Sequence, residues 1–231
     1  MNRIIFSLVM CFVALTNPIL AADKLTISNF QIIYGTTDYE FTIDLNNDQA
    51  YAAFQFDLYL PKGITIAIYS AGNRLPANTD LQMQQQTDGS YRFIAVPPDL
   101  NSNITGTSGS IINITVTVNS SVSFGSLTGY FRNVKLSDAK GEGNTYNEMS
   151  FPVTVLKLGD VNGDGDVDIA DAVCIVNHIV GKPNATFVEA VADADSDGTI
   201  DIADAVHIVN LVVGKITSLT PKFNFTLPEP Q

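Results

Sequence analysis

The chain has 231 residues, with 24 acidic and 12 basic side chains and a formal net charge of −12. A surface of this charge repels nucleic acid and anionic lipid and attracts divalent cations, so we expect no nucleic-acid partner. Eleven of the 24 acidic residues fall between Asp160 and Asp204, which concentrates the negative charge in the C-terminal part of the chain.

Residues 1–22 have the order of a secretory signal peptide. One positive charge, Arg3, precedes an almost uninterrupted apolar run over 4–15, and two alanines close the segment. The run is shorter than the ~20 apolar residues of a membrane span, and no later segment is typical of one. We therefore expect a secreted protein, extracellular or associated with the cell surface, whose mature chain begins near Asp23.

Cysteine usage limits how the mature chain can be stabilised. The sequence holds two cysteines, and the first lies within the predicted signal peptide. Cys174 is then the only thiol, so we expect no internal disulfide. Stability must come from apolar burial or from bound metal.

Residues 23–157 alternate apolar and polar side chains with a period of two. The clearest runs are 39–45, 54–60 and 112–118, each typical of a half-buried strand. Further strands are expected at 25–33, 64–69, 91–96, 129–136 and 150–156. Turn-forming Asn, Asp, Gly and Pro separate the runs. About eight or nine such strands predict an all-β antiparallel sandwich of jelly-roll or immunoglobulin-like topology.

The period changes to 3.6 in residues 158–216, which predicts a small all-α domain with two helices. The apolar residues with this period are Ile169, Val173, Val176 and Val180 in the first helix and Ile202, Val206, Val209 and Val213 in the second. Gly181 and Gly214 are placed to end these helices. The boundary near 157–159 is short, and 217–231 form a tail.

An internal repeat with an offset of 33 residues is the strongest signal in the chain. Residues 160–182 and 193–215 match at 15 of 23 positions without a gap. Each copy begins with the spacing of an EF-hand calcium loop and places a glycine, Gly165 or Gly198, at its sharp turn. Short carboxylates on alternating loop residues converge on one point, as a hard cation requires.

We predict two calcium ions, one in each loop. The predicted ligands are Asp160, Asn162, Asp164, Asp166, Asp168 and Asp171 in the first loop and Asp193, Asp195, Asp197, Thr199, Asp201 and Asp204 in the second. Asp166 and Thr199 occupy position 7, where the backbone carbonyl coordinates. The last ligand of each loop lies on the first turn of the following helix, so the metal also fixes where that helix starts.

The two copies resemble a known family. GDVNGDGDVDIADAVCIVNHIVGK and DADSDGTIDIADAVHIVNLVVGK are similar to the two halves of a type I dockerin, over residues 159–215. The resemblance implies a module that binds a cohesin on another protein when calcium is present. It also implies a place in a cellulosome-like, polysaccharide-degrading complex.

The resemblance also implies a docking surface on the two helices. The predicted partner-binding residues are Ile169, Ala170, Val176 and Asn177 in the first copy and Ile202, Ala203, Val209 and Asn210 in the second. Loop positions 10 and 11 are often polar in the family, whereas both copies here carry the same apolar Ile-Ala pair. We therefore expect either helix to engage the partner, in two related orientations.

The strand region has a resemblance of its own. Residues 53–61, 129–138 and 150–155 are similar to strands of cohesin modules, although carbohydrate-binding modules share this architecture. A cohesin-like module would bind protein, including dockerin-bearing proteins, and the chain would act as an adaptor. The alternative is a glycan-binding module that the dockerin tethers to a complex, with polysaccharide as its partner. The absence of tryptophan weighs against sugar binding.

We expect no catalytic activity. Residues 23–157 contain neither His nor Cys, because His178, His207 and Cys174 all lie in the predicted helical domain. A Ser-His-Asp or Cys-His nucleophile is therefore absent from the strand region. Its carboxylates form no recognisable glycosidase pair either.

Overall fold

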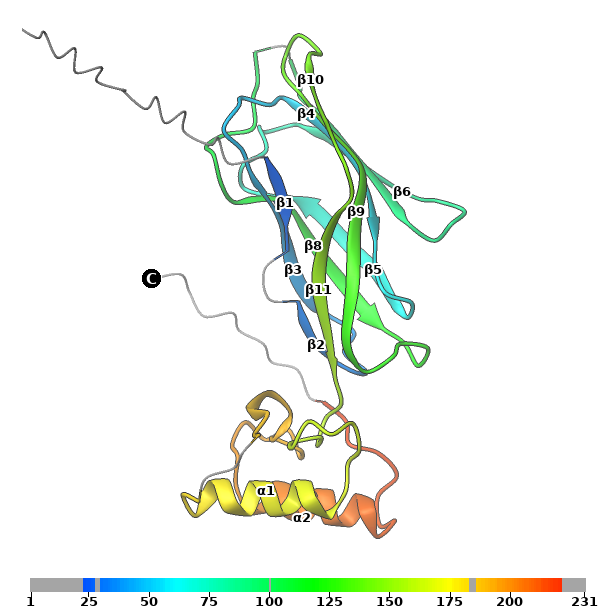
Figure 1. The fold of residues 1–231 in the computed structure, drawn as a ribbon, viewed down its shortest axis with the longest axis vertical. Coiled ribbons are helices and arrows are strands. Elements are labelled where there is room, and N and C mark those ends of the chain that lie inside the picture. The colour runs from blue at the N-terminus through cyan, green and yellow to red at the C-terminus, as the bar shows by residue number, and fades with distance from the viewer. Residues whose placement is uncertain (1–22, 28–29, 100, 183–185, 222–231) are drawn as a thin grey trace, which may run out of the picture.

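The computed structural model describes residues 23–27, 30–99, 101–182 and 186–221, and the predicted signal peptide lies outside them. The described residues form a β-sandwich followed by a pair of helices (Figure 1). The predicted fold class, a β-sandwich followed by a small helical domain, is confirmed.

The sandwich contains two sheets. Its strands are β1 (Lys24–Thr26), β2 (Gln31–Ile33), β3 (Tyr39–Asn46), β4 (Ala53–Tyr59), β5 (Ile64–Ala71), β6 (Asp80–Gln85), β7 (Tyr91–Val96), β8 (Ser110–Val118), β9 (Gly125–Ser137), β10 (Gly143–Tyr146) and β11 (Met149–Leu156). One sheet has the order β1-β3-β8-β5, and the other has the order β2-β11-β9-β4-β7-β6 with β10 paired to β9.

Most of the predicted strands are present, with three differences. The run expected at 25–33 is divided between β1 and β2, which lie in different sheets. β2 pairs with β11 in parallel, so the sandwich is not purely antiparallel. β6 and β10 were not predicted. Neither shows strong apolar alternation in its sequence.

Aromatic side chains fill the space between the sheets. The rings of Phe93 and Phe131 each lie 5.4 Å from the ring of Phe56, and all three side chains are fully buried. Phe56 alternates along β4 with polar outward-facing residues, as the period-two pattern predicted. Strands β4, β7 and β9 therefore supply the aromatic side chains at the centre of the core.

Truncation of this aromatic centre is expected to destabilise the sandwich strongly. Phe56→Ala should lower the free energy of unfolding by about 3–5 kcal/mol, because it removes buried apolar surface and leaves a cavity. Urea unfolding followed by tyrosine circular dichroism measures the change. Ile68→Ala is the matched control, since Ile68 is 64% exposed and its loss should cost less than ~0.5 kcal/mol. Equal effects of the two substitutions would contradict this description of the core.

The helical part is built around α1 (Ile169–Ile179) and α2 (Ile202–Val212), with a short 3-10 helix η1 (Glu189–Val191) between them. The two helices lie side by side (Figure 1). Their shared core contains Val161, Ala172, Ile175, Ala192, Ala194, Ala205 and Ile208. Leu219 packs against this core, so part of the predicted tail contributes to the packing of the helices.

The two parts of the chain join directly. β11 ends at Leu156, Leu158 is buried, and the amide of Gly159 donates to the carbonyl of Val191 at 2.9 Å. Gly159 has a φ of +89°, and a Cβ at this position would lie 2.5 Å from Leu219 Cδ1. Glycine is therefore required where the sandwich passes into the first acidic loop.

Neither helix, nor any other within the described ranges, combines the length and hydropathy of a membrane span.

Candidate metal centres

Each acidic loop leads directly into a helix and caps its first turn. The Asp168 carboxylate accepts a hydrogen bond from the amide of Ala170 at 2.6 Å, and the Asp171 carboxylate accepts from the amide of Asp168 at 2.8 Å. Asp201 and Asp204 repeat this capping box at the start of α2. Two of the predicted ligands in each loop are thus positioned by the start of the helix itself.

The last predicted ligand of each loop is a buried carboxylate. Asp171 is 0% exposed and Asp204 is 1% exposed. Asp171 Oδ1 accepts from the amides of Val161 and Asn162 at 2.8 and 3.0 Å, so the end of the first loop is tied to its beginning. Burial raises the pKa of Asp204, with a further contribution from neighbouring acidic residues. A cation would compensate the buried negative charge.

The first loop contains a carboxylate oxygen without a partner. Asp160 Oδ2 accepts from the amide of Gly165 at 3.0 Å, whereas Oδ1 is buried and has no hydrogen-bond partner among the described residues. Burial raises the pKa of Asp160, and the charges of Asp171 and Asp164 add to this effect. An orphaned, desolvated carboxylate oxygen at a predicted ligand position is what a metal site requires.

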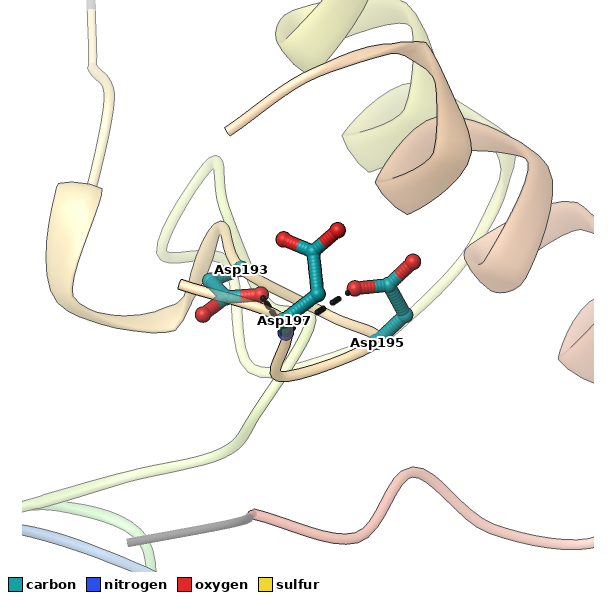
Figure 2. Close-up of side chains that lie close together, drawn as sticks. All are labelled: Asp193, Asp195 and Asp197. Carbon is teal, nitrogen blue, oxygen red and sulfur yellow. Dashed lines mark hydrogen bonds between the residues drawn. The ribbon is translucent and has the colours of Figure 1, made fainter. Parts of the chain in front are cut away.

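The second loop gathers three carboxylates. Asp193, Asp195 and Asp197 each offer an oxygen, and these oxygens lie within 4.8 Å of one another (Figure 2). The amide of Asp197 donates to Asp193 Oδ1 at 3.0 Å and to Asp195 Oδ1 at 3.1 Å. Carboxylates this close repel one another unless a cation lies between them.

The position-7 residues also hold a neighbouring carboxylate in place. The amide of Asp166 donates to Asp164 Oδ1 at 2.9 Å. The amide and the hydroxyl of Thr199 donate to Asp197 Oδ1 at 2.9 and 2.8 Å. These bonds orient the position-5 ligand in both loops and leave the position-7 carbonyls available for coordination.

The donor set fits calcium. Loop residues 160–171 and 193–204 offer carboxylates, one side-chain amide and backbone carbonyls, and contain neither His nor Cys. All-oxygen sets with several carboxylates suit a hard cation rather than zinc or copper. The described geometry thus fits the ion predicted for each loop.

Comparison with known protein families agrees with this chemistry. Residues 158–212 match the dockerin type I domain. The resemblance noted in the sequence is confirmed for this dockerin module. Type I dockerin domains bind calcium, which supports calcium as the metal of the acidic loops.

Solved structures similar to the sandwich are cohesins. The seventh ScaB type I cohesin from Pseudobacteroides cellulosolvens is 16% identical with a TM-score of 0.49, covering 58% of this chain and 92% of that chain. The Coh-OlpA–Doc918 complex from Clostridium thermocellum gives the same identity and TM-score, covering 58% and 99%. A non-cellulosomal cohesin from Archaeoglobus fulgidus is 11% identical with a TM-score of 0.47, covering 59% and 92%. No curated protein matches the chain.

Apolar side chains line the outer surface of both helices. The exposed large apolar residues are Ile169, Val173, Val176, Ile179 and Val180 on α1 and its end, and Ile202, Val206, Val212 and Val213 on α2 and its end. The opposite sides of the helices carry Ala172, Ile175, Ala205 and Ile208 into the shared core. We call the exposed set the apolar stripes.

The predicted partner-binding residues divide into two groups. Ile169, Ala170, Val176, Ile202 and Ala203 are exposed, whereas Asn177, Val209 and Asn210 are half-buried. Val209 packs against the shared core, unlike its counterpart Val176. The carbonyls of Asn177 and Asn210 accept from the amides of Lys182 and Lys215 at 2.8 Å and close the helix ends. The two copies therefore present similar but not identical surfaces.

Two contacts of the loops involve residues outside the predicted set. Lys157 Nζ donates to the carbonyl of Gly165 at 3.4 Å and lies 5.8 Å from the centroid of the Phe124 ring. The Ser196 hydroxyl donates to the carbonyl of Thr220 at 3.2 Å. No motif marks these contacts, because each joins a loop of the repeat to a residue outside it, Lys157 or Thr220.

The outer side of the β9-β4-β7 region mixes polar and apolar groups. The Arg132 guanidinium lies over the rings of Tyr59 and Tyr130, at 4.7 and 5.3 Å from their centroids, and forms an ion pair with Glu148. Ile94 on β7 is exposed nearby in the same sheet. Tyr59 and Tyr130 pair across β4 and β9, and the guanidinium lies against both rings, so this aromatic surface carries a positive charge.

Proposed function

We propose that the chain is a secreted, non-catalytic assembly protein. Its dockerin module binds a cohesin module of another protein in a calcium-dependent manner, and its sandwich binds a second protein. The observation that carries this proposal is the pair of apolar stripes, exposed on helices whose starts are fixed by the acidic loops.

The apolar stripes are better explained as a surface that a partner protein buries than as one that stays in contact with water. Nine large apolar side chains are exposed on two adjacent helices, and a soluble monomer rarely exposes such a group without a function. The sequence repeat gives both helices related surfaces, with Ile169 and Ile202 at the same position. A partner surface complementary to one helix would therefore also fit the other.

The sandwich has a surface suited to protein. Its β9-β4-β7 region offers an arginine over two tyrosine rings, and the aliphatic Ile94 and Val96 are exposed on β7. Tyrosine and arginine are enriched at the centres of protein interfaces. A row of exposed aromatic rings free of charge would favour sugar instead, and the arginine over Tyr59 and Tyr130 supports the protein partner.

The setting we propose is a cellulosome-like complex that degrades polysaccharide. The dockerin attaches the chain to that complex, and the sandwich recruits a further component, with dockerin-bearing proteins as the candidates. Two ions are proposed to be bound, one by each loop, through the ligands predicted from the repeat.

A pull-down from the culture medium of the source organism tests the proposal. The bait is the full mature chain, used with calcium and again with excess EGTA, and captured proteins are identified by mass spectrometry. Recovery of cohesin-bearing proteins only in calcium is the expected result. A second bait, Ile94→Asp with Tyr130→Ala, should retain these proteins and lose those bound through the sandwich. Capture of no cohesin-bearing protein in calcium would contradict the docking function.

A further inference from the structure

The two calcium loops differ at their third position. The first loop has Asn162 there, and its amide Nδ2 donates to Asp164 Oδ2 at 2.8 Å. The second loop has Asp195, whose carboxylate joins those of Asp193 and Asp197 within 4.8 Å. At position 3 the first loop thus already supplies a hydrogen-bond donor to a ligand carboxylate, whereas the second supplies a third carboxylate, so a cation relieves more repulsion in the second loop.

The carboxylates are also distributed differently. Each loop contains five aspartates, but one of the five in the first loop is Asp166 at position 7, where the backbone carbonyl is the predicted ligand. The first loop therefore offers four carboxylate ligands and an amide, and the second offers five carboxylates. Calcium affinity rises with the number of charged ligands in a site.

A basic side chain lies against the first loop. Lys157 donates to the carbonyl of Gly165, and its charge contributes to the lowered pKa of Asp164, after hydrogen bonds from Asp166 and Asn162. The equivalent position before the second loop is Ala190. A positive charge held at 3.4 Å from a loop oxygen opposes the approach of a cation.

We propose that calcium fills the second loop before the first, and that the residue at position 3 sets this order. The inference rests on the proposed calcium sites and adds that they act in sequence. Occupation of the second loop anchors α2 first. Occupation of the first loop then fixes α1 and the segment from Lys157 to Gly159 that joins it to the sandwich.

Two glycine amides report the loops separately. Gly165 donates to Asp160 Oδ2 and Gly198 to Asp193 Oδ2, both at 3.0 Å, so each amide senses the ligand carboxylate of its own loop. The full mature chain, labelled with ¹⁵N, is titrated with calcium in chelator buffers. The calcium-bound peak of Gly198 should reach half intensity at a free calcium concentration roughly tenfold or more below that of Gly165.

Reciprocal variants test the cause of the order. Asn162→Asp with Asp195→Asn exchanges the position-3 residues without changing the net charge, and should reverse the order of the two glycine peaks. Lys157→Met should bring the Gly165 midpoint several-fold closer to that of Gly198.

Coincident midpoints of the two glycine peaks in the wild type, or a lower midpoint for Gly165, would overturn the proposed order. An unchanged order in the exchanged variant would overturn the role of position 3. A chain in which neither peak responds to calcium would overturn the calcium sites themselves, and the proposed function with them.

Discussion

Removal of calcium with excess EGTA is expected to unfold the dockerin module and leave the sandwich folded. The module has a small core in which four of the seven buried residues are alanines. A segment of this size without disulfides is at the limit of independent stability. Without the ion, the buried carboxylates of Asp171 and Asp204 also lack a cationic partner, which destabilises the folded form further.

The size of the effect follows from mass action. If calcium binds each loop with a Kd of ~10 μM, about 1 mM extracellular calcium stabilises the folded module by ~2.7 kcal/mol per site. Two sites then contribute about as much as the whole stability of a small domain. The sandwich, whose core contains three fully buried phenylalanines at its centre, has no need of this contribution.

Two spectroscopic signals separate the parts of the chain. Far-UV circular dichroism follows α1 and α2. All eight tyrosines lie between residues 34 and 146, and tryptophan is absent, so near-UV dichroism of tyrosine reports on the sandwich. EGTA should abolish the helical signal and preserve the tyrosine signal, and re-addition of calcium should restore the former.

A double variant provides the control for chelation. Asp171→Asn with Asp204→Asn removes the buried ligand charge from both loops and should give the EGTA-like spectrum even with calcium present. A helical signal that persists in excess EGTA would contradict a metal-dependent fold. Loss of the tyrosine signal would show instead that the sandwich depends on the dockerin module.

The two acidic loops and the helix that follows each could be predicted because their geometry is local. Ligands at fixed spacing within twelve residues, a glycine at the turn and a following helix are all encoded in neighbouring positions. The last ligand of the first loop was expected on the first turn of the following helix, and α1 does begin at Ile169, with Asp168 as its cap and Asp171 in its first turn. The same locality explains the core strands, where side chains such as Phe56 alternate with outward-facing polar groups.

What depends on distant contacts could not be predicted. β6 has the sequence Asp-Leu-Gln-Met-Gln-Gln, and its only apolar side chains, Leu81 and Met83, are partly buried, so its pairing with β7 supplies what its own pattern lacks. Parallel pairing of β2 with β11 joins segments about 120 residues apart, and nothing in either segment specifies it.

Which side of each helix is buried also could not be predicted from the sequence. Apolar residues surround both helices, and periodicity marks the valine-rich stripes most strongly. The structure buries the opposite side, where Ala172 and Ala205 allow α1 and α2 to approach closely and Ile175 and Ile208 fill the space. The helices therefore pack through the side with the small alanines, and the larger apolar side chains of the stripes face outward.

Charge placed on both apolar stripes is expected to abolish docking while the module stays folded. Ile169→Asp with Ile202→Asp replaces side chains that are 48% and 59% exposed at the first turn of each helix. An acidic residue at a helix N-terminus is favourable to the helix, so the fold should tolerate both changes. Cohesin binding should weaken by ~100-fold or more, because a carboxylate would be desolvated at the centre of an apolar contact.

The single variants distinguish one docking orientation from two. If each helix can bind the partner independently, Ile169→Asp or Ile202→Asp alone should weaken binding only about twofold, since one of two equivalent orientations remains. Isothermal titration with the captured cohesin in calcium measures all three variants, with helical circular dichroism recorded on the same samples. Thr217→Asp adds a charge at an exposed position outside the stripes, so it is the control for added charge and should bind as the wild type does.

Full affinity of the double variant for the cohesin would exclude the stripes as the docking surface. A single variant that loses all binding would instead assign docking to the helix that carries it. If docking uses one helix, α1 is the expected one, because its Val176 is exposed whereas the corresponding Val209 on α2 packs against the core.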